Sequence, residues 1–167
     1  MTKAKSPHEY VFKVWVKGAR RVSRTLAFRG DQTLDDLHEA VFQAFDRFDP
    51  HLYTFYFPKM IPKRGVRPAN VTEYAPPFML EDPGPFPCPR LLDATKSRLD
   101  DIRLHVGQEF EYLFDFGDSW VHEIEVLSIG DVQAGRKYPA LLEKKGTSPP
   151  QYERVADDEE DASEMAG

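Results

Sequence analysis

The strict alternation of side chains between Glu109 and Leu127 constrains the fold of this chain more than any other feature. From Glu109 to Phe116, aromatic residues fill every second position and charged residues fill most of the positions between them. A similar alternation starts again after residues 117–119, with four residues in one phase: Trp120, His122, Ile124 and Val126. Because a period of two residues indicates a strand with one buried face, the stretch predicts a β-hairpin.

The length of the turn in this hairpin determines which side chains face the core. A two-residue turn would mix aromatic and charged residues on both faces, whereas a three-residue turn at 117–119 makes one face apolar and the other acidic. We therefore predict the three-residue turn, with Asp118 in the turn and Asp115 on the solvent side. The cross-strand pairs predicted for the apolar face are Phe116 with Trp120, Phe114 with His122 and Tyr112 with Ile124.

The remainder of the chain predicts an α+β protein. Residues 10–17 and 21–28 alternate and predict a second hairpin, and residues 51–57 predict a further strand. Thr33 and Asp36 make a weak capping box at the start of an apolar stripe that is typical of a core-facing helix. We expect a mixed or antiparallel sheet packed against this one long helix, with the order β-β-α-β followed by the hairpin. This order is similar to a β-grasp arrangement.

The length of 167 residues suits a single domain, which we assign to residues 1–155. Residues 58–90 hold nine of the fourteen prolines and show little periodicity, so they predict an irregular, proline-rich insertion. The acidic residues 156–167 predict a disordered tail.

Cysteine content and hydropathy indicate the compartment. Cys88 is the one cysteine, which excludes an internal disulfide and a multi-cysteine zinc site. No apolar run approaches the ~20 residues that span a bilayer, and the lysines near the start are not followed by the apolar segment of a signal peptide. We therefore expect a cytoplasmic protein without a membrane partner.

Charge is unevenly distributed along the chain. Residues 1–30 hold eight Lys/Arg and one acidic residue, a net charge of +7, and the other residues hold fourteen Lys/Arg and twenty-seven acidic residues, a net charge of −13. This asymmetry permits either a basic binding face or charge pairing between the two parts. A basic patch around an aromatic is typical of nucleic-acid-binding surfaces and also of ordinary solvated sheet faces. Its candidate residues are Lys13, Trp15, Lys17, Arg21 and Arg24.

Histidines and aspartates supply the second candidate site. The helix, the third strand and the hairpin could bring together His38, His51, Asp118 and His122, with Asp115 and Trp120 beside them. Mixed imidazole and carboxylate ligation suits zinc, manganese or iron, and such a centre would support a metal-dependent hydrolase or nuclease. The alternative is that His38 and His122 are neutral core residues satisfied by hydrogen bonds.

Five segments together resemble the plasmid pRiA4b ORF-3-like family: YVFKVWVKG, TLDDLHEAVFQAF, FDPHLYTF, YLFDFGDSWVHEIEV and YPALL. The chain departs from the family pattern at residues 22–24, at Arg47-Phe48 and at Tyr53, and its Ser148-Pro149-Pro150 lacks flanking cysteines. The resemblance implies an association with mobile-element genes and a biochemical activity that is not established.

These observations favour a non-catalytic binding module, which would present a basic hairpin and a proline-rich arm to a macromolecular partner. Two alternatives stay open. One is the metal-dependent hydrolase or nuclease with the histidine and aspartate cluster. The other is a nucleic-acid-binding protein whose affinity falls steeply with salt.

Overall fold

Half of the structure is strand, and the strands form one sheet. The computed structural model describes residues 7–57, 71–81, 91–115 and 120–149. It contains 50% strand and 18% helix. The prediction of an α+β fold with a β-grasp-like order is therefore wrong, because the protein is mostly β, with an eight-stranded sheet around one substantial helix.

The sheet has the strand order β5-β4-β3-β6-β7-β1-β2-β8. All neighbouring strands are antiparallel except β4 and β5. The strands are β1 (His8–Val16), β2 (Ala19–Arg29), β3 (Tyr53–Phe57), β4 (Thr72–Ala75), β5 (Leu91–Asp93), β6 (Glu109–Phe114), β7 (Trp120–Asp131) and β8 (Ala140–Lys145).

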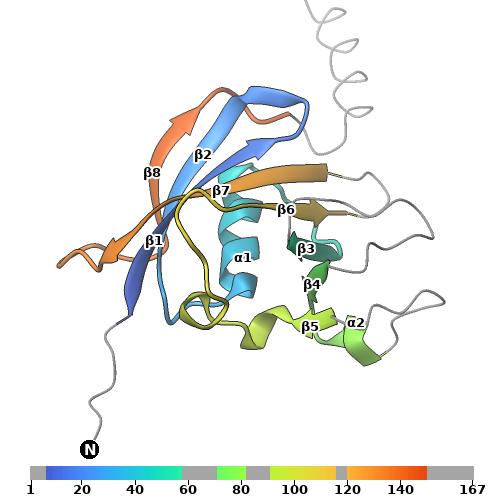
Figure 1. Ribbon diagram of the computed structural model, residues 1–167. Helices are drawn as coiled ribbons and strands as arrows, with labels where there is room; N and C mark the ends of the chain where they lie inside the picture. The colour runs from blue at the N-terminus through green and yellow to red at the C-terminus, as the bar shows by residue number, and fades with distance from the viewer. Residues whose placement is uncertain (1–6, 58–70, 82–90, 116–119, 150–167) are drawn as a thin grey trace, which may run out of the picture.

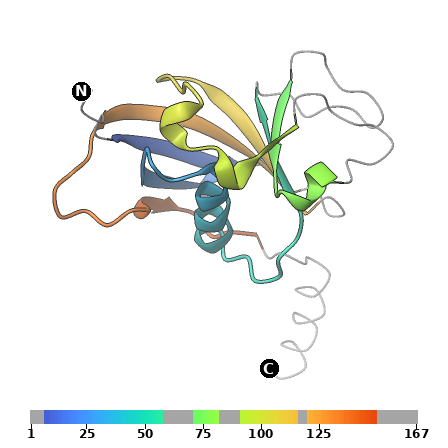
Figure 2. The same cartoon turned by 90° about the horizontal axis from the view of Figure 1, so that it is seen from below.

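The helices are short apart from one. They are α1 (Leu34–Ala44), α2 (Phe78–Glu81) and the two 3₁₀ turns η1 (Ala94–Lys96) and η2 (Leu99–Asp101). The sheet curves around α1, which lies against its concave side (Figure 1, Figure 2). Within the described ranges, no helix has the length and apolar character needed to cross a membrane.

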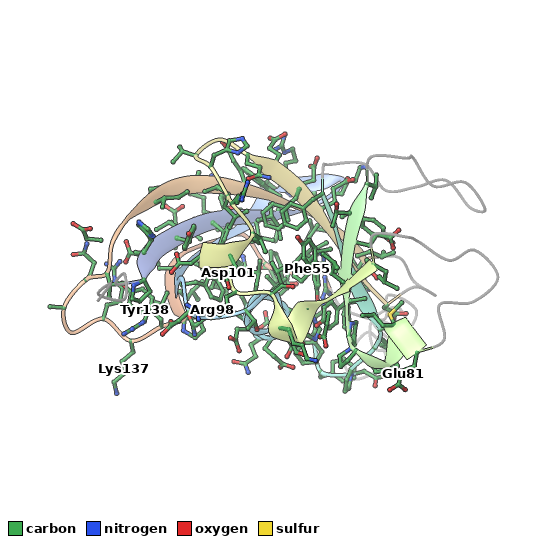
Figure 3. All side chains as sticks on the ribbon, turned by 60° about the horizontal axis from the view of Figure 1, so that its bottom comes forward. Phe55, Glu81, Arg98, Asp101, Lys137 and Tyr138 are labelled. Atoms are coloured by element: carbon green, nitrogen blue, oxygen red, sulfur yellow. The ribbon has the colours of Figure 1, made fainter. Side chains whose placement is uncertain are left out.

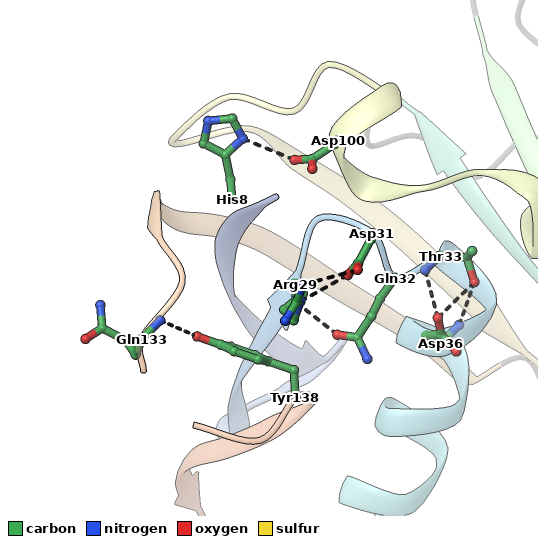
Figure 4. Close-up of polar contacts among 9 residues, drawn as sticks. All are labelled: His8, Arg29, Asp31, Gln32, Thr33, Asp36, Asp100, Gln133 and Tyr138. Carbon is green, nitrogen blue, oxygen red and sulfur yellow. Dashed lines mark hydrogen bonds and ion pairs between the residues drawn. The ribbon is translucent and has the colours of Figure 1, made fainter. Parts of the chain in front are cut away.

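The predicted capping box of α1 is present. Thr33 accepts a hydrogen bond from the backbone of Asp36, and the Asp36 carboxylate accepts one from the backbone of Thr33 (Figure 4). The preceding turn is held by Gln32, whose side chain accepts a hydrogen bond from the amide of Arg29. These local bonds satisfy donors that a helix start would otherwise leave without partners.

The core lies between α1 and the concave face of the sheet. Aromatic side chains of β6 pack there against those of β1 and β3, as in the stack of Phe57 on Phe110 at 4.3 Å between ring centroids. Phe55 lies in this packed layer, whereas Glu81 and Lys137 lie at the periphery (Figure 3). The strict alternation in β6 and β7 therefore reports a buried face, as predicted.

The β6–β7 register differs from the predicted one. Phe114 lies opposite Trp120, Tyr112 opposite His122 and Phe110 opposite Ile124. The turn is thus longer than three residues, because Asp115 leaves the strand with a φ of +64° and donates its amide to the carbonyl of Leu52. The shift amounts to two residues on one strand, so the residues paired in β6 and β7 keep their predicted faces, whereas Asp115 lies beyond the end of β6. Asp118 lies outside the described residues.

Two strands, β4 and β8, were not predicted from the sequence. Residues 71–81, inside the predicted irregular insertion, contain β4 and α2, and β4 joins β3 to β5. The edge strand β8 reads ALLEKK, which has no alternation because its side chains are mostly exposed. The other residues of the insertion and the acidic tail lie outside the described ranges.

Candidate functional site

The end of α1 fixes the position of the most unusual side chain in the molecule, Arg47. The helix ends with Asp46 in the left-handed region, at a φ of +57°. The amide of Asp46 bonds to the carbonyl of Gln43, and the amide of Arg47 bonds to that of Phe42. This pattern is a Schellman motif, which satisfies the last helix carbonyls and turns the chain inward. Arg47 consequently points into the protein.

The guanidinium of Arg47 is buried but only partly hydrogen-bonded. Its Nη1 donates to the carbonyl of Pro149 at 3.1 Å, and its centre lies 4.2 Å from the ring of Trp120. Its Nε and Nη2 are buried, and neither has a hydrogen-bond acceptor among the described residues. Burial lowers the pKa of Arg47 to about 10, so the group is still charged at neutral pH.

His122 lies near this cation on β7. Its Nδ1 is 3.1 Å from the carbonyl oxygen of Trp120, which accepts a hydrogen bond, so Nδ1 carries the proton and Nε2 holds a lone pair. Nε2 is buried, and no residue in the described part of the chain forms a hydrogen bond with it. Burial, and then the charge of Arg47, lower the pKa of His122 to about 3. The imidazole is therefore neutral.

His38 lies on the other side of the Tyr112 ring, on α1. Its ring stacks on Tyr53 at 3.8 Å between centroids, and its Nδ1 shares a 2.5 Å hydrogen bond with the hydroxyl of Tyr112. Burial lowers the pKa of His38 to about 4. His38 and His122 both contact Tyr112, with ring separations of 5.8 Å and 5.2 Å.

His51 belongs to a different group. Its Nε2 is 3.5 Å from carboxylate oxygens of both Asp49 and Asp115. Asp115 is buried rather than solvent-facing, because the turn at its positive φ directs it away from the outer face. Among the residues that the structure describes, no three His, Cys, Asp or Glu side chains are grouped so as to hold a metal ion. The metal hypothesis also includes Asp118, which is not described.

The basic patch is divided by the structure. Lys13 and Arg20 lie over the ring of Trp15, at 5.3 Å and 4.6 Å from its centroid. Lys17 pairs with Glu111 on β6 at 3.3 Å, and Arg20 pairs with Glu123 on β7 at 3.8 Å. Charge pairing with the acidic strands therefore offsets the positive charges of Lys17 and Arg20 on this face.

Arg24 does not belong to that face, because its side chain is fully buried on the concave side. Its Nε donates to the carbonyl of Ala44 at 2.8 Å, at the end of α1. Its Nη1 lies within hydrogen-bond distance of the carbonyls of Ser23, Lys145 and Gly146. Only Nη2 lacks an acceptor. A cation at a helix C-terminus is favourable, so Arg24 joins β2, α1 and the end of β8.

A groove of about 550 Å³ opens where β8 ends. Arg21 is exposed at the groove, and Val22 forms part of its apolar wall. The opposite wall is the segment after β8, whose Ser148 hydroxyl donates to the carbonyl of Phe45. The lining residues are Ala19, Arg21, Val22, Gly146, Thr147, Ser148 and Pro149.

Sequence reasoning missed Arg47 altogether and misplaced Arg24. Arg24 interrupts the apolar phase Val22-Leu26-Phe28, and that position between core residues was the signal for a buried cation. Arg47 follows the helix directly, where a C-terminal motif turns the chain toward the core. Alternation of apolar and polar residues cannot predict burial at such a position, because the residue lies outside any strand or helix.

A family model described as "Plasmid pRiA4b ORF-3-like protein" matches residues 8–155 and confirms the resemblance noted in the sequence. Among solved structures, the crystal structure of a protein of unknown function from Methanosarcina mazei Go1 has a TM-score of 0.67 and 22% identity, covering 88% of this chain and 74% of that one. At this identity, the likeness concerns the fold alone. No curated protein matches the chain.

Proposed function

We propose that this chain, which belongs to the plasmid pRiA4b ORF-3-like family, is a non-catalytic binding module that takes up an extended peptide segment of a protein partner along β8. The plasmid reading frame in the family name supports the association with mobile elements that the resemblance implies. The single cysteine, Cys88, supports a cytoplasmic setting.

The observation that carries this proposal is the exposed edge of the sheet at β8. The strand is six residues long and pairs with β2 on one side, and no other strand of the described ranges pairs with it. Leu141 and Leu142 are 51% and 43% exposed on this strand. An exposed strand edge can bind an extended peptide through main-chain hydrogen bonds, with side chains on either face supplying specificity.

The groove extends this edge and indicates the chemistry of the peptide. It begins at Gly146, directly after the last residue of β8, and its wall is mostly apolar. The positive charges of Arg21 and Lys144 favour a peptide that carries an acidic residue next to an apolar one, whereas Lys145 lies 3.9 Å from Glu143 on the same strand. Arg24 holds the carbonyls of Lys145 and Gly146, which keeps the edge in a fixed shape.

The two alternatives have weaker support. A nucleic-acid surface needs uncompensated positive charge, whereas Lys17 and Arg20 pair with glutamates and Trp15 is covered by two cations. A metal-dependent hydrolase gains one feature, the lone pair on Nε2 of His122. The positive charge of Arg47 opposes a metal ion at that nitrogen.

The test is a selection of binding peptides from a random dodecapeptide library, followed by anisotropy titrations of the best fluorescent peptide. We expect enrichment of apolar-acidic sequences and a loss in affinity of about tenfold or more in Leu141→Asp, because an apolar contact is removed and the new charge repels an acidic peptide. Leu127→Asp is the matched control, since Leu127 is an exposed leucine on β7.

Two results would count against peptide binding at β8. One is a selection that yields no binding peptide. The other is equal binding by the Leu141→Asp and Leu127→Asp variants, because affinity would then not depend on the edge strand. Peptides methylated on alternate backbone nitrogens give a further check, since a peptide in a β ladder loses affinity only at the positions whose N–H groups face the edge.

A further inference from the structure

The unsatisfied nitrogens of Arg47 lie on one edge of its guanidinium. Nε and Nη2 each direct an N–H bond outward from this edge, and the two bonds are nearly parallel. Together they can donate hydrogen bonds to two oxygens of one ligand. Nη1, on the other side, is already engaged with the carbonyl of Pro149. The side chain of Arg47 is more than nine-tenths buried, and no acceptor meets either Nε or Nη2.

We propose that Arg47, together with Trp120 and His122, forms a binding site for an oxyanion that presents two oxygens in one plane, a carboxylate or a phosphate. The proposal does not depend on peptide binding at β8, because none of its three residues lies on that strand.

The chemistry of the three side chains suits such a ligand. The free edge of Arg47 would donate two charge-assisted hydrogen bonds, which are about twice as strong as neutral ones. The lone pair on Nε2 of His122 could accept a hydrogen bond from a protonated oxygen of the ligand. The central carbon of the guanidinium lies 4.2 Å from the centroid of the Trp120 ring, and Trp120 is partly exposed, so the site is close to the surface.

Electrostatics favour an anion over a cation at this place. Besides burial, the charge of Arg47 lowers the pKa of His122, which indicates a positive potential at the imidazole. The charge of Asp46 opposes the lowering of the pKa of both Arg47 and Arg24, but within the described residues neither guanidinium forms an ion pair with that carboxylate. A bound oxyanion would give Arg47 the direct counter-charge that Asp46 does not supply.

The competing explanation is that Arg47 is a structural anchor. Its bond to Pro149 ties the segment after β8 to the end of α1, and water could satisfy the other two nitrogens. The two explanations differ in one measurable respect. A site for an oxyanion saturates with inorganic phosphate or acetate, whereas a hydrated anchor responds equally to chloride at the same ionic strength.

The experiment follows the side-chain Nε–H signals of arginines by NMR in the intact protein during titration at constant ionic strength. Inorganic phosphate, sodium acetate and sodium chloride are the three probes. We expect the Arg47 signal to shift saturably with phosphate, with acetate or with both, and not with chloride. The signal of Arg20 is the internal control, because Arg20 also stacks on a tryptophan but is exposed.

Two variants complete the test. Arg47→Lys keeps the charge and removes the two-nitrogen edge, so we expect affinity for the probe to fall about tenfold or more, while Arg20→Lys leaves it unchanged. A linear, chloride-like response of Arg47 in the unaltered protein would overturn the site without any variant. Equal affinity in Arg47→Lys, or tighter binding of zinc chloride than of phosphate at His122, would overturn it as well.

Discussion

Arg24 and Arg47 approach the same end of α1 from two sides, yet their surroundings differ. Arg24 reaches the carbonyl of Ala44 with Nε and three further carbonyls with Nη1. Arg47 makes one hydrogen bond and rests on Trp120. Both are buried. The first cation is therefore a structural connection, whereas the second retains binding capacity that the described part of the protein does not use.

The comparison teaches that burial alone does not separate a structural cation from a binding one. The two kinds of cation differ in the number of hydrogen-bond acceptors around the guanidinium and in which edge of it has no acceptor. Arg24 retains only Nη2, which cannot bind an oxyanion through two nitrogens. Arg47 retains Nε and Nη2, which can.

The largest effect should come from removing each cation in turn. Arg24→Met leaves several buried carbonyls without a donor, and we expect it to reduce the free energy of unfolding by about 3–5 kcal/mol. Arg47→Met removes a poorly satisfied buried charge, and we expect a change of about 1 kcal/mol or less. Chemical denaturation measures both. Equal losses would show that the two arginines have the same structural role.

Acid should destabilise the protein through the two buried histidines. The folded-state pKa values, about 4 for His38 and about 3 for His122, lie below the unfolded value of 6.5. Their contribution to stability is therefore complete above pH 6.5 and is lost as the pH falls toward the folded values. Between pH 8 and pH 5, we expect a loss of about 2 kcal/mol per histidine.

Urea titrations over this pH range would measure that loss, and variants connect it to the two arginines. His122→Phe should fold and should show about half of the acid-induced loss. Arg47→Met should leave the loss down to pH 5 almost unchanged and should reduce it at lower pH, because the charge of Arg47 contributes to the low folded-state pKa of His122. Arg24→Met should leave the pH dependence unaltered. An unchanged acid response in His122→Phe would contradict the assignment.

Gly146 tests the acceptors on which Arg24 depends. Its φ is +74°, and a Cβ there would lie 2.9 Å from the carbonyl oxygen of Arg21. Gly146→Ala should therefore move the segment whose carbonyl bonds to Arg24 and should cost about 1–3 kcal/mol of stability. Gly135→Ala is the control, since it has a similar positive φ of +82° but open space around the added methyl. Thermal melts of the two variants would separate the two causes. Gly135→Ala reports the backbone strain of a positive φ alone, and any further loss in Gly146→Ala reports the close approach of the added Cβ to Arg21.

Replacement of Arg20 should have the smallest effect on stability, because Arg20 is an arginine on the surface rather than in the core. It is exposed, stacks on Trp15 and lies 3.8 Å from Glu123. Exposed ion pairs contribute little, so Arg20→Met should change the free energy of unfolding by about 0.5 kcal/mol or less. A loss as large as that of Arg24→Met would mean that the convex face depends on its ion pairs.

Much of the local structure could be predicted from the sequence. Alternation located β1, β6 and β7, and the apolar stripe with its capping box located α1. Periodicity is reliable for such elements because burial of one face imposes it on the sequence. The fold class was not predictable in this way. The strand β4 has only four residues and lies in a proline-rich stretch, which hides its alternation. The edge strand β8 is mostly exposed, and its partner β2 lies more than a hundred residues away in the sequence.

The candidate site shows the same limit. His38 and His122 were expected on the core face, and they lie there beside Tyr112. Arg47 could not be located, because its position depends on the backbone turn at Asp46 and on Pro149, more than a hundred residues away. A contact between residues so far apart in the sequence does not affect the periodicity of side chains within one strand or helix. The metal and nucleic-acid ligands named from the sequence stay predictions.

The strand order has a consequence for how the chain folds. The β1–β2 hairpin and β3 flank the β6–β7 hairpin and do not pair with each other. During synthesis, the apolar face of α1 and the inner edge of β3 therefore stay uncovered until strands that lie much later in the sequence have been made. Such long-range closure is slow for β proteins, on the order of milliseconds to seconds. The first sixty residues should bind chaperones on the ribosome, and docking of the β6–β7 hairpin should be the step that releases them.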